Sequence, residues 1–180
     1  LWNEHHVQLD ITEQDLEDLK HGCVDMYTFS YYMSSLITTH EIADAVGGNF
    51  TTGARNEYLQ YSDWGWAFDP DGLQYYLEMI YDRYQRPLMV VENGLGAFDK
   101  VEDGQVHDPY RIAYLKAHIE ELKKACDDGC RVLAYCTWSY TDLLSWLNGY
   151  QKRYGFVYVD REEDENSDTL NRYKKDSYYW

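Results

Sequence analysis

Apolar residues recur along the chain with a helical period in three segments. In residues 69–86 and 108–127 they recur at intervals of three and four, the period of an amphipathic helix, and an Asp-Pro pair opens each segment. A shorter helix is predicted over residues 12–20, with Thr12 as its N-cap. The helix over residues 108–127 is predicted to bury one apolar face, formed by Ile112, Leu115, Ile119, Leu122 and Cys126.

Other segments are apolar without a helical period. Residues 88–91 and 130–137 are largely apolar runs, which are typical of strands buried on both faces of a parallel sheet. The aromatic-rich residues 23–33 are predicted to form a third strand, and residues 154–159 a polar-flanked ribbon. Residues 34–69 show no clear period and are predicted to form a long loop, a kind of segment that is usually functional in compact domains.

Strands and helices alternate along the chain, and this order predicts an α/β fold. Long segments follow the strands on the same side, as in a (β/α) barrel, whose active site gathers at the carboxyl ends of its strands. A complete barrel has about eight strands, so residues 1–180 are expected to form a single partial domain. The acidic residues 160–168 are predicted to form a solvated loop, and another helix is predicted to begin near Tyr173.

Acidic residues outnumber basic ones by 32 to 16, which gives a formal net charge of -16. This charge repels nucleic acid and anionic membrane surfaces, so neither is an expected partner. No stretch is apolar enough to span a membrane, and residues 1–10 lack the features of a signal peptide. A cytoplasmic protein with reduced thiols is expected. Cys126 and Cys130 stand close in sequence without a histidine-cysteine cluster, so no metal site is expected.

Glu92 follows the apolar run 88–91 directly and precedes the turn residues Asn93 and Gly94. A charge at the end of a buried strand must be compensated by nearby groups. The pattern alone leaves two interpretations open: Glu92 pairs with an arginine or caps a helix, or it takes part in chemistry. The 19 tyrosines and 6 tryptophans suit sugar binding, because their rings combine a flat apolar face with a donor, although most of them must serve packing.

Four motifs together resemble glycoside hydrolase family 1, in its 6-phospho-β-glycosidase branch. They are Phe-Ser-Tyr-Tyr-Met-Ser at 29–34, Val-Glu-Asn-Gly at 91–94, Trp-Ser-Tyr-Thr-Asp at 138–142 and Asn-Gly-Tyr-Gln-Lys-Arg-Tyr-Gly at 148–155. The resemblance implies that the chain is the C-terminal part of a (β/α)8 TIM barrel. It also implies that Glu92 is the nucleophile of a retaining glycosidase and that Tyr32 hydrogen-bonds it, with core packing as the alternative role of Tyr32.

The resemblance further implies a phosphate clamp, formed by Ser145, Lys152 and Tyr154. Ser145 stands where family members that act on unphosphorylated sugars have a glutamate, and a carboxylate there would repel a 6-phosphate that a serine hydroxyl can bind. Lysine suits a phosphate as a point charge. The alternative interpretation is that Lys152 and Arg153 are a solvated pair on the surface of an acidic protein.

Three tryptophans resemble substrate-binding residues of the family. Trp138 resembles the platform under the sugar ring, and Trp66 resembles the aromatic residue that lines the leaving-group subsite. Anchoring the start of the helix over 69–86 is the alternative role of Trp66. Trp146, directly after Ser145, resembles the pattern of 6-phospho-β-galactosidases, whereas residues 65–70 and 90–99 resemble 6-phospho-β-glucosidases. A 6-phospho-β-glucosidase that tolerates galactosides is therefore the preferred interpretation.

No Asn-Glu-Pro motif occurs in the chain, so the acid/base glutamate of the family is missing from it. The first hypothesis is the C-terminal portion of a retaining 6-phospho-β-glucosidase, which acts on 6-phosphorylated β-glycosides, needs the N-terminal half of the barrel and is inactive alone. The second is a non-catalytic phospho-sugar-binding or assembly fragment. Neither hypothesis implies a cofactor or a metal, and homo-oligomerisation is left open.

Overall fold

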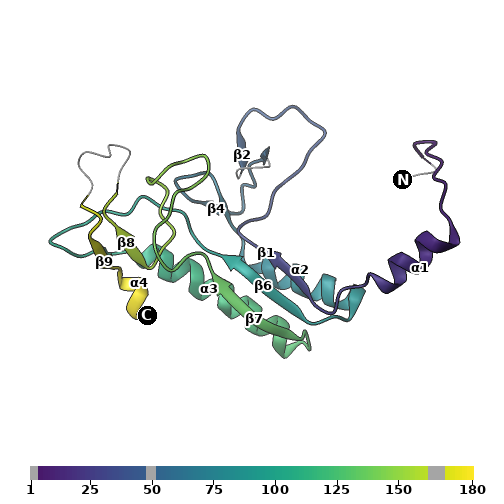
Figure 1. The fold of residues 1–180 in the computed structure, drawn as a ribbon. Coiled ribbons are helices and arrows are strands. Elements are labelled where there is room, and N and C mark those ends of the chain that lie inside the picture. The colour runs from purple at the N-terminus through teal and green to yellow at the C-terminus, as the bar shows by residue number, and fades with distance from the viewer. Residues whose placement is uncertain (1–3, 48–51, 162–168) are drawn as a thin grey trace.

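A computed structural model describes residues 4–47, 52–161 and 169–180 of the protein (Figure 1). Its centre is a three-stranded parallel sheet with the order β1-β6-β7. The strands are β1 (Tyr27–Ser30), β6 (Leu88–Asn93) and β7 (Val132–Thr137). The prediction of a parallel α/β sheet is confirmed. Because the strands are parallel, their carboxyl ends lie at one edge of the sheet.

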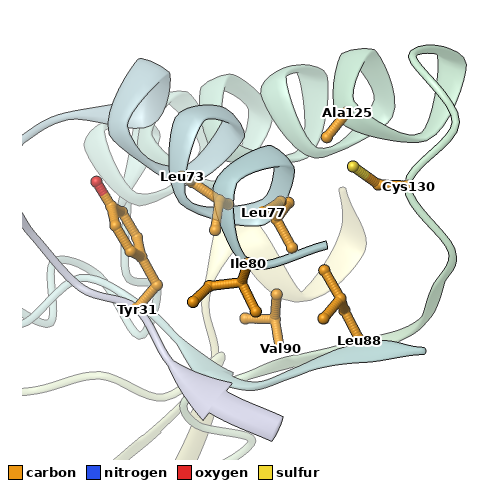
Figure 2. Close-up of a cluster of buried hydrophobic side chains, with 8 residues drawn as sticks. All are labelled: Tyr31, Leu73, Leu77, Ile80, Leu88, Val90, Ala125 and Cys130. Atoms are coloured by element: carbon orange, nitrogen blue, oxygen red, sulfur yellow. The ribbon is translucent and has the colours of Figure 1, made fainter. Parts of the chain in front are cut away.

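Two long helices, α2 (Pro70–Tyr84) and α3 (Pro109–Asp127), connect these strands and pack against each other. Leu73, Leu77 and Ile80 of α2 form a buried apolar cluster with Leu88 and Val90 of β6 and with Ala125 of α3 (Figure 2). Tyr31 and Cys130 complete this cluster. The helical stripe predicted for residues 69–86 therefore faces the sheet.

The helix boundaries follow local chemistry. Asp69 caps α2, because its Oδ1 accepts a hydrogen bond of 3.0 Å from Gly72 N, and Pro70 occupies the first turn. The short helix α1 (Glu13–His21) has the predicted N-cap: Thr12 and Asp15 form a capping box. No residue of α1 is buried, so its stability depends on local contacts in this chain.

The α3 face predicted from apolar spacing is wrong in part. The buried residues of α3 are Arg111, Tyr114, Leu115, His118, Glu121 and Ala125, whereas Ile119 and Cys126 are exposed. The buried face is polar because it carries hydrogen bonds and ion pairs under the loops at the carboxyl edge. Strand β7 is also less buried than predicted: Leu133 is exposed, because β7 is an edge strand of the sheet.

The other predicted strand and the long loop need correction. Within residues 23–33 only β1 is a strand, and Cys23 is exposed. The segment predicted as a long loop contains two antiparallel pairs, β2 (Ala45–Gly47) with β3 (Thr52–Ala54) and β4 (Gln60–Tyr61) with β5 (Ala67–Phe68). These strands have two or three residues each, too few to produce a visible alternation in the sequence.

The C-terminal region forms a second small unit beside α3. Strand β8 (Val157–Val159) pairs in an antiparallel manner with β9 (Arg172–Lys174), and the last helix is α4 (Asp176–Tyr179). Tyr173 belongs to β9, so the helix predicted near it begins later. Most of the acidic run lies outside the described residues. Within the parts described, no helix has the length and apolar character that crossing a membrane requires.

Candidate active site

The carboxyl edge of the sheet brings Glu92 and Tyr32 together. Ser30 at the end of β1 lies opposite Glu92, and Tyr31 N donates a hydrogen bond of 2.9 Å to Glu92 O. The Tyr32 hydroxyl donates to Glu92 Oε2 over 2.9 Å. Among the described residues, no basic side chain forms an ion pair with Glu92, and Glu92 caps none of the helices. Within the described residues, Glu92 therefore neither pairs with an arginine nor caps a helix.

The two residues after Glu92 fix how the strand ends. Asn93 is fully buried and donates to Tyr31 O over 2.7 Å, while its Oδ1 accepts from the Tyr135 hydroxyl over 2.5 Å. Gly94 lies against Trp138: a Cβ added at Gly94 would lie 1.8 Å from Trp138 O. Only glycine fits there, because any side chain would displace the backbone that carries Trp138.

An aromatic cluster adjoins Glu92. The ring of Tyr32 lies edge-on to that of Trp66, with centroids 5.2 Å apart, and Tyr154 lies 6.1 Å from Trp66 and 6.5 Å from Tyr32. Trp66 and Tyr154 are both buried. The contacts of the Trp66 ring are with Tyr32, Tyr154 and Lys152, three residues of the predicted site.

Lys152 points its ammonium group into this cluster. Its Nζ lies 3.6 Å from the ring centroid of Trp66 and 5.3 Å from that of Trp64, and the side chain is only 1% exposed. Within the described ranges, no carboxylate oxygen lies within salt-bridge distance of Lys152 Nζ. Burial lowers the pKa of Lys152 to about 8. Gly96 makes room for the lysine stem, since a Cβ there would lie 2.5 Å from Lys152 Cε.

The remaining predicted site residues differ in how deeply they are buried. Ser145 is buried and hydrogen-bonds Tyr154. Burial raises the pKa of Tyr154 to about 12, and the hydrogen bond with Ser145 opposes this rise. The Tyr154 phenol is therefore protonated at neutral pH and can donate. Trp138 is half-buried at the end of β7, and Trp146 is 80% exposed. The structure thus brings Ser145, Lys152 and Tyr154 together.

A buried charge network, which the sequence interpretation missed, lies beside the clamp. It comprises Asp99, Asp108, Arg111, Asp142, Arg153 and Lys175. Arg111 binds Asp99 and Asp108 at 2.7 and 2.8 Å, and Arg153 Nη1 lies 3.1 Å from Asp142 Oδ2.

Lys175 joins the two halves of this network. Its Nζ lies 2.8 Å from Asp142 Oδ1 and also binds Asp99. The interpretation of Lys152 and Arg153 as a solvated pair is wrong, because both side chains are buried. The partners are 33 and 76 residues apart in sequence, and no local pattern marks such distant pairs.

The edge therefore combines a carboxylate with a phenol donor, flat aromatic faces, and a buried cation flanked by two hydroxyl groups. This arrangement suits a sugar that carries an anionic substituent. Among the residues that the structure describes, no group of three histidine, cysteine or acidic side chains could hold a metal ion.

Known proteins share this sequence and fold. The chain is 49% identical to the aryl-phospho-β-D-glucosidase BglA of Bacillus subtilis (strain 168), over 95% of this chain and 37% of that protein. It is 47% identical to a 6-phospho-β-glucosidase of Dickeya chrysanthemi, over 99% of this chain and 39% of that protein.

Among solved structures, the family 1 β-glucosidase of Thermotoga maritima matches with a TM-score of 0.76 and 32% identity, over 94% of this chain and 37% of that one. The chain thus spans less than two fifths of the length of these relatives, and its open sheet is part of a (β/α)8 barrel. The model of glycosyl hydrolase family 1 matches residues 1–180. The chain belongs to glycosyl hydrolase family 1.

Proposed function

We propose that these residues are the C-terminal portion of a cytoplasmic, retaining 6-phospho-β-glucosidase that also accepts 6-phospho-β-galactosides. The relatives that match the chain over nearly its whole length include a 6-phospho-β-glucosidase, which supports this substrate class. The observation that carries the proposal is the environment of Lys152, a buried ammonium group beside Ser145 and Tyr154 that has no carboxylate partner among the described residues.

A buried cation without a counter-ion is unfavourable, because the aqueous hydration of the charge is lost. The cation–π interaction with the face of Trp66 stabilises the charge by about 2 kcal/mol in a desolvated setting, which is less than an anion would supply. A phosphate dianion is opposite in charge to the lysine and can serve as its counter-ion. The phosphate oxygens can accept hydrogen bonds from the hydroxyl groups of Ser145 and Tyr154. The phosphate clamp therefore selects 6-phosphorylated sugars over neutral ones.

Glu92 supplies the nucleophile in the proposed reaction. One carboxylate oxygen attacks the anomeric carbon while the bond from that carbon to the leaving oxygen breaks, and an acid outside this chain protonates the leaving oxygen. Water then attacks the glycosyl-enzyme and gives its proton to that same acid/base group, so the anomeric configuration is retained. Tyr32 holds Oε2 of Glu92, which leaves the other oxygen free to attack.

Aromatic faces orient the sugar for this attack. Trp138, directly after β7, lies under the ring. Trp66, whose ring also contacts Lys152 and Tyr154 of the clamp, borders the leaving-group side. Trp146, which follows the clamp serine, is the third aromatic residue proposed to bind the substrate.

The test uses the complete polypeptide, the product of the whole coding sequence that contains these 180 residues. It should release nitrophenol from 4-nitrophenyl β-glucoside 6-phosphate, and Glu92→Gln should lower kcat by at least about 1,000-fold. Binding of glucose 6-phosphate should persist in that variant, because the clamp is intact. Glu120→Gln, on the exposed side of α3, is the matched control and should keep full activity. Full activity of Glu92→Gln would exclude Glu92 as the nucleophile.

A second candidate is a non-catalytic phospho-sugar-binding or assembly fragment. It is favoured by the absence of an Asn-Glu-Pro motif from the 180 residues. The isolated chain should not hydrolyse the nitrophenyl substrate, since one carboxylate cannot both attack and protonate. Quenching of tryptophan fluorescence by millimolar glucose 6-phosphate would support binding without catalysis. Turnover by the isolated chain would contradict the need for the missing half of the barrel.

A further inference from the structure

The side chain of Tyr114, on α3, reaches the edge of the sheet where Glu92 lies. Its hydroxyl donates to Tyr32 O over 2.8 Å and accepts a hydrogen bond of 3.1 Å from Asn93 Nδ2. Tyr32 is the residue whose own hydroxyl binds Glu92, and Asn93 is the next residue in the chain after Glu92. The Tyr114 hydroxyl thus contacts both the residue that hydrogen-bonds the predicted nucleophile and the residue that follows it in the chain.

The ring of Tyr114 is held in place from several directions. It is only 4% exposed, lies edge-on to Phe68 with centroids 5.6 Å apart, and packs against His118 at 4.0 Å. His118 Nδ1 also hydrogen-bonds Tyr114 O over 2.8 Å, one helical turn away. The hydroxyl is therefore delivered from a rigid helix, with little freedom to turn away.

The two partners of Tyr114 differ in how the sheet holds them: the backbone of Asn93 pairs with β7, whereas Tyr32 has no strand pairing. Tyr32 lies beyond Ser30, the last residue of β1, so no strand pairing holds its backbone in place. Asn93 ends β6, and its Nδ2 is shared between Tyr31 O and the Tyr114 hydroxyl. If the hydroxyl is removed, Tyr32 O loses its donor and can shift, whereas Asn93 Nδ2 loses one of its two acceptors and keeps Tyr31 O.

We propose that Tyr114 is a positioning residue: its hydroxyl fixes Tyr32 and Asn93 together, and in this way aims the Glu92 carboxylate at the anomeric carbon. The inference rests on the proposed function and deepens it, because it concerns the same attack. Tyr114 touches no substrate in this arrangement and acts only through its two neighbours. A displacement of about 1 Å at a nucleophile can lower a rate about 100-fold.

The experiment compares Tyr114→Phe with Tyr76→Phe in the complete polypeptide. Tyr76 on α2 also has a hydrogen-bonded hydroxyl, 2.9 Å from that of Tyr27, but it is partly buried against the core cluster and its partner begins β1, at the end of the strand away from the carboxyl edge. With 4-nitrophenyl β-glucoside 6-phosphate, Tyr114→Phe should lower kcat about 10- to 100-fold and leave KM within about twofold. Tyr76→Phe should change neither constant.

A second measurement isolates the attack itself. A 2-deoxy-2-fluoro-β-glucosyl fluoride 6-phosphate carries a leaving group that departs without a proton donor, so its covalent trapping reports on the nucleophile. Mass spectrometry should locate the adduct on Glu92 in the wild type, and Tyr114→Phe should slow trapping by the same factor as kcat. Replacing Tyr114 by 4-aminophenylalanine, which keeps the donor to Tyr32 O but is a poor acceptor for Asn93 Nδ2, should restore part of the rate.

The outcomes distinguish a failure of the proposed function from a failure of the role proposed for Tyr114. A wild-type protein that neither hydrolyses the phosphorylated substrate nor is trapped overturns both proposals. A wild type that is active and trapped at Glu92, together with an unchanged kcat for Tyr114→Phe, overturns only the role of Tyr114. If Tyr114→Phe does not fold, the 4-aminophenylalanine protein takes its place: because it lacks a good acceptor for Asn93 Nδ2, its trapping should be slowed, and a trapping rate equal to that of the wild type overturns the role of the hydroxyl.

Discussion

Lys152 and Lys175 are both buried lysines, with exposed fractions of 1% and 0%, but they have opposite surroundings. Lys175 lies between the carboxylates of Asp99 and Asp142, whereas Lys152 lies against the rings of Trp66 and Trp64. Burial lowers the pKa of both, but the two carboxylates oppose this effect only at Lys175. Lys175 thus has carboxylate partners inside the fold, whereas Lys152 has none among the described residues.

The regions around the two lysines differ in the same way. The charge network around Lys175 contains three acidic and three basic side chains, so its formal charges cancel inside the protein. The region around Lys152 offers aromatic faces and hydroxyl groups, which solvate a cation without neutralising it. Substitutions at the two lysines should therefore affect different properties of the protein.

The largest effect is expected from Lys175→Met. The change leaves Asp99 and Asp142 without one of their shared partners, and breaking a buried ion pair costs about 3–5 kcal/mol. Urea unfolding of the chain should report a loss of this size in the free energy of unfolding. Lys174→Met is the neighbouring control: Lys174 is exposed and stacks on Tyr178, a contact worth about 0.5–1 kcal/mol. Equal losses for the two variants would contradict the comparison.

Lys152→Met should change activity rather than stability. In the complete polypeptide, kcat/KM for 4-nitrophenyl β-glucoside 6-phosphate should fall about 100-fold, since a charged hydrogen bond to phosphate is worth about 1.5–3 kcal/mol. Activity on the unphosphorylated glucoside should not fall, and the free energy of unfolding should hold or rise because an unpaired buried charge is gone. The exposed Lys123→Met serves as the control. A stability loss as large as that of Lys175→Met would remove the distinction between the two lysines.

The smallest effect is the pH dependence of binding. The clamp needs the charged form of Lys152, and its pKa in the ligand-free chain is about 8. Affinity for glucose 6-phosphate should therefore fall about tenfold between pH 7 and pH 9, a range in which the phosphate stays a dianion. Isothermal titration calorimetry of the complete polypeptide measures this fall, which Lys152→Met should abolish.

The same pKa shift affects folding with the opposite sign. Because the folded pKa of Lys152 lies below its ordinary value of 10.5, the unfolded chain binds more protons between pH 8 and pH 10.5. The contribution of Lys152 to the free energy of unfolding thus rises with pH across this window. The difference between the wild type and Lys152→Met should show that rise.

The sequence predicted the elements that have a clear period and missed those that depend on distant contacts. The runs over 88–91 and 130–137 and the helical stripe over 69–86 correspond to β6, β7 and α2, because burial against a sheet imposes a regular spacing. The short strands β2 to β5 leave no period, since each has two or three residues. The apolar spacing of α3 was misleading because that helix turns charged and polar residues inward.

The candidate site also has features that the sequence predicted and features that it did not. The position of Glu92 followed from a buried strand that ends in a turn, and the contact of Tyr32 with Glu92 is as the family resemblance implied. The grouping of Ser145, Lys152 and Tyr154 also agrees with the resemblance. The packing of Lys152 against Trp64 and Trp66 was not predicted, because it depends on how the segment before α2 folds over the end of the sheet.

The position of Lys175 in the chain has a consequence for biosynthesis. Asp99 and Asp142 leave the ribosome well before Lys175 does, so both buried carboxylates lack their shared cation while the chain is still growing. Since domains generally fold as units, the clamp region can reach its final arrangement only after β9 and α4 have been made. A ribosome that stalls before the codon of Lys175 would release a chain with uncompensated interior charge, which is a substrate for proteolysis rather than a slower enzyme.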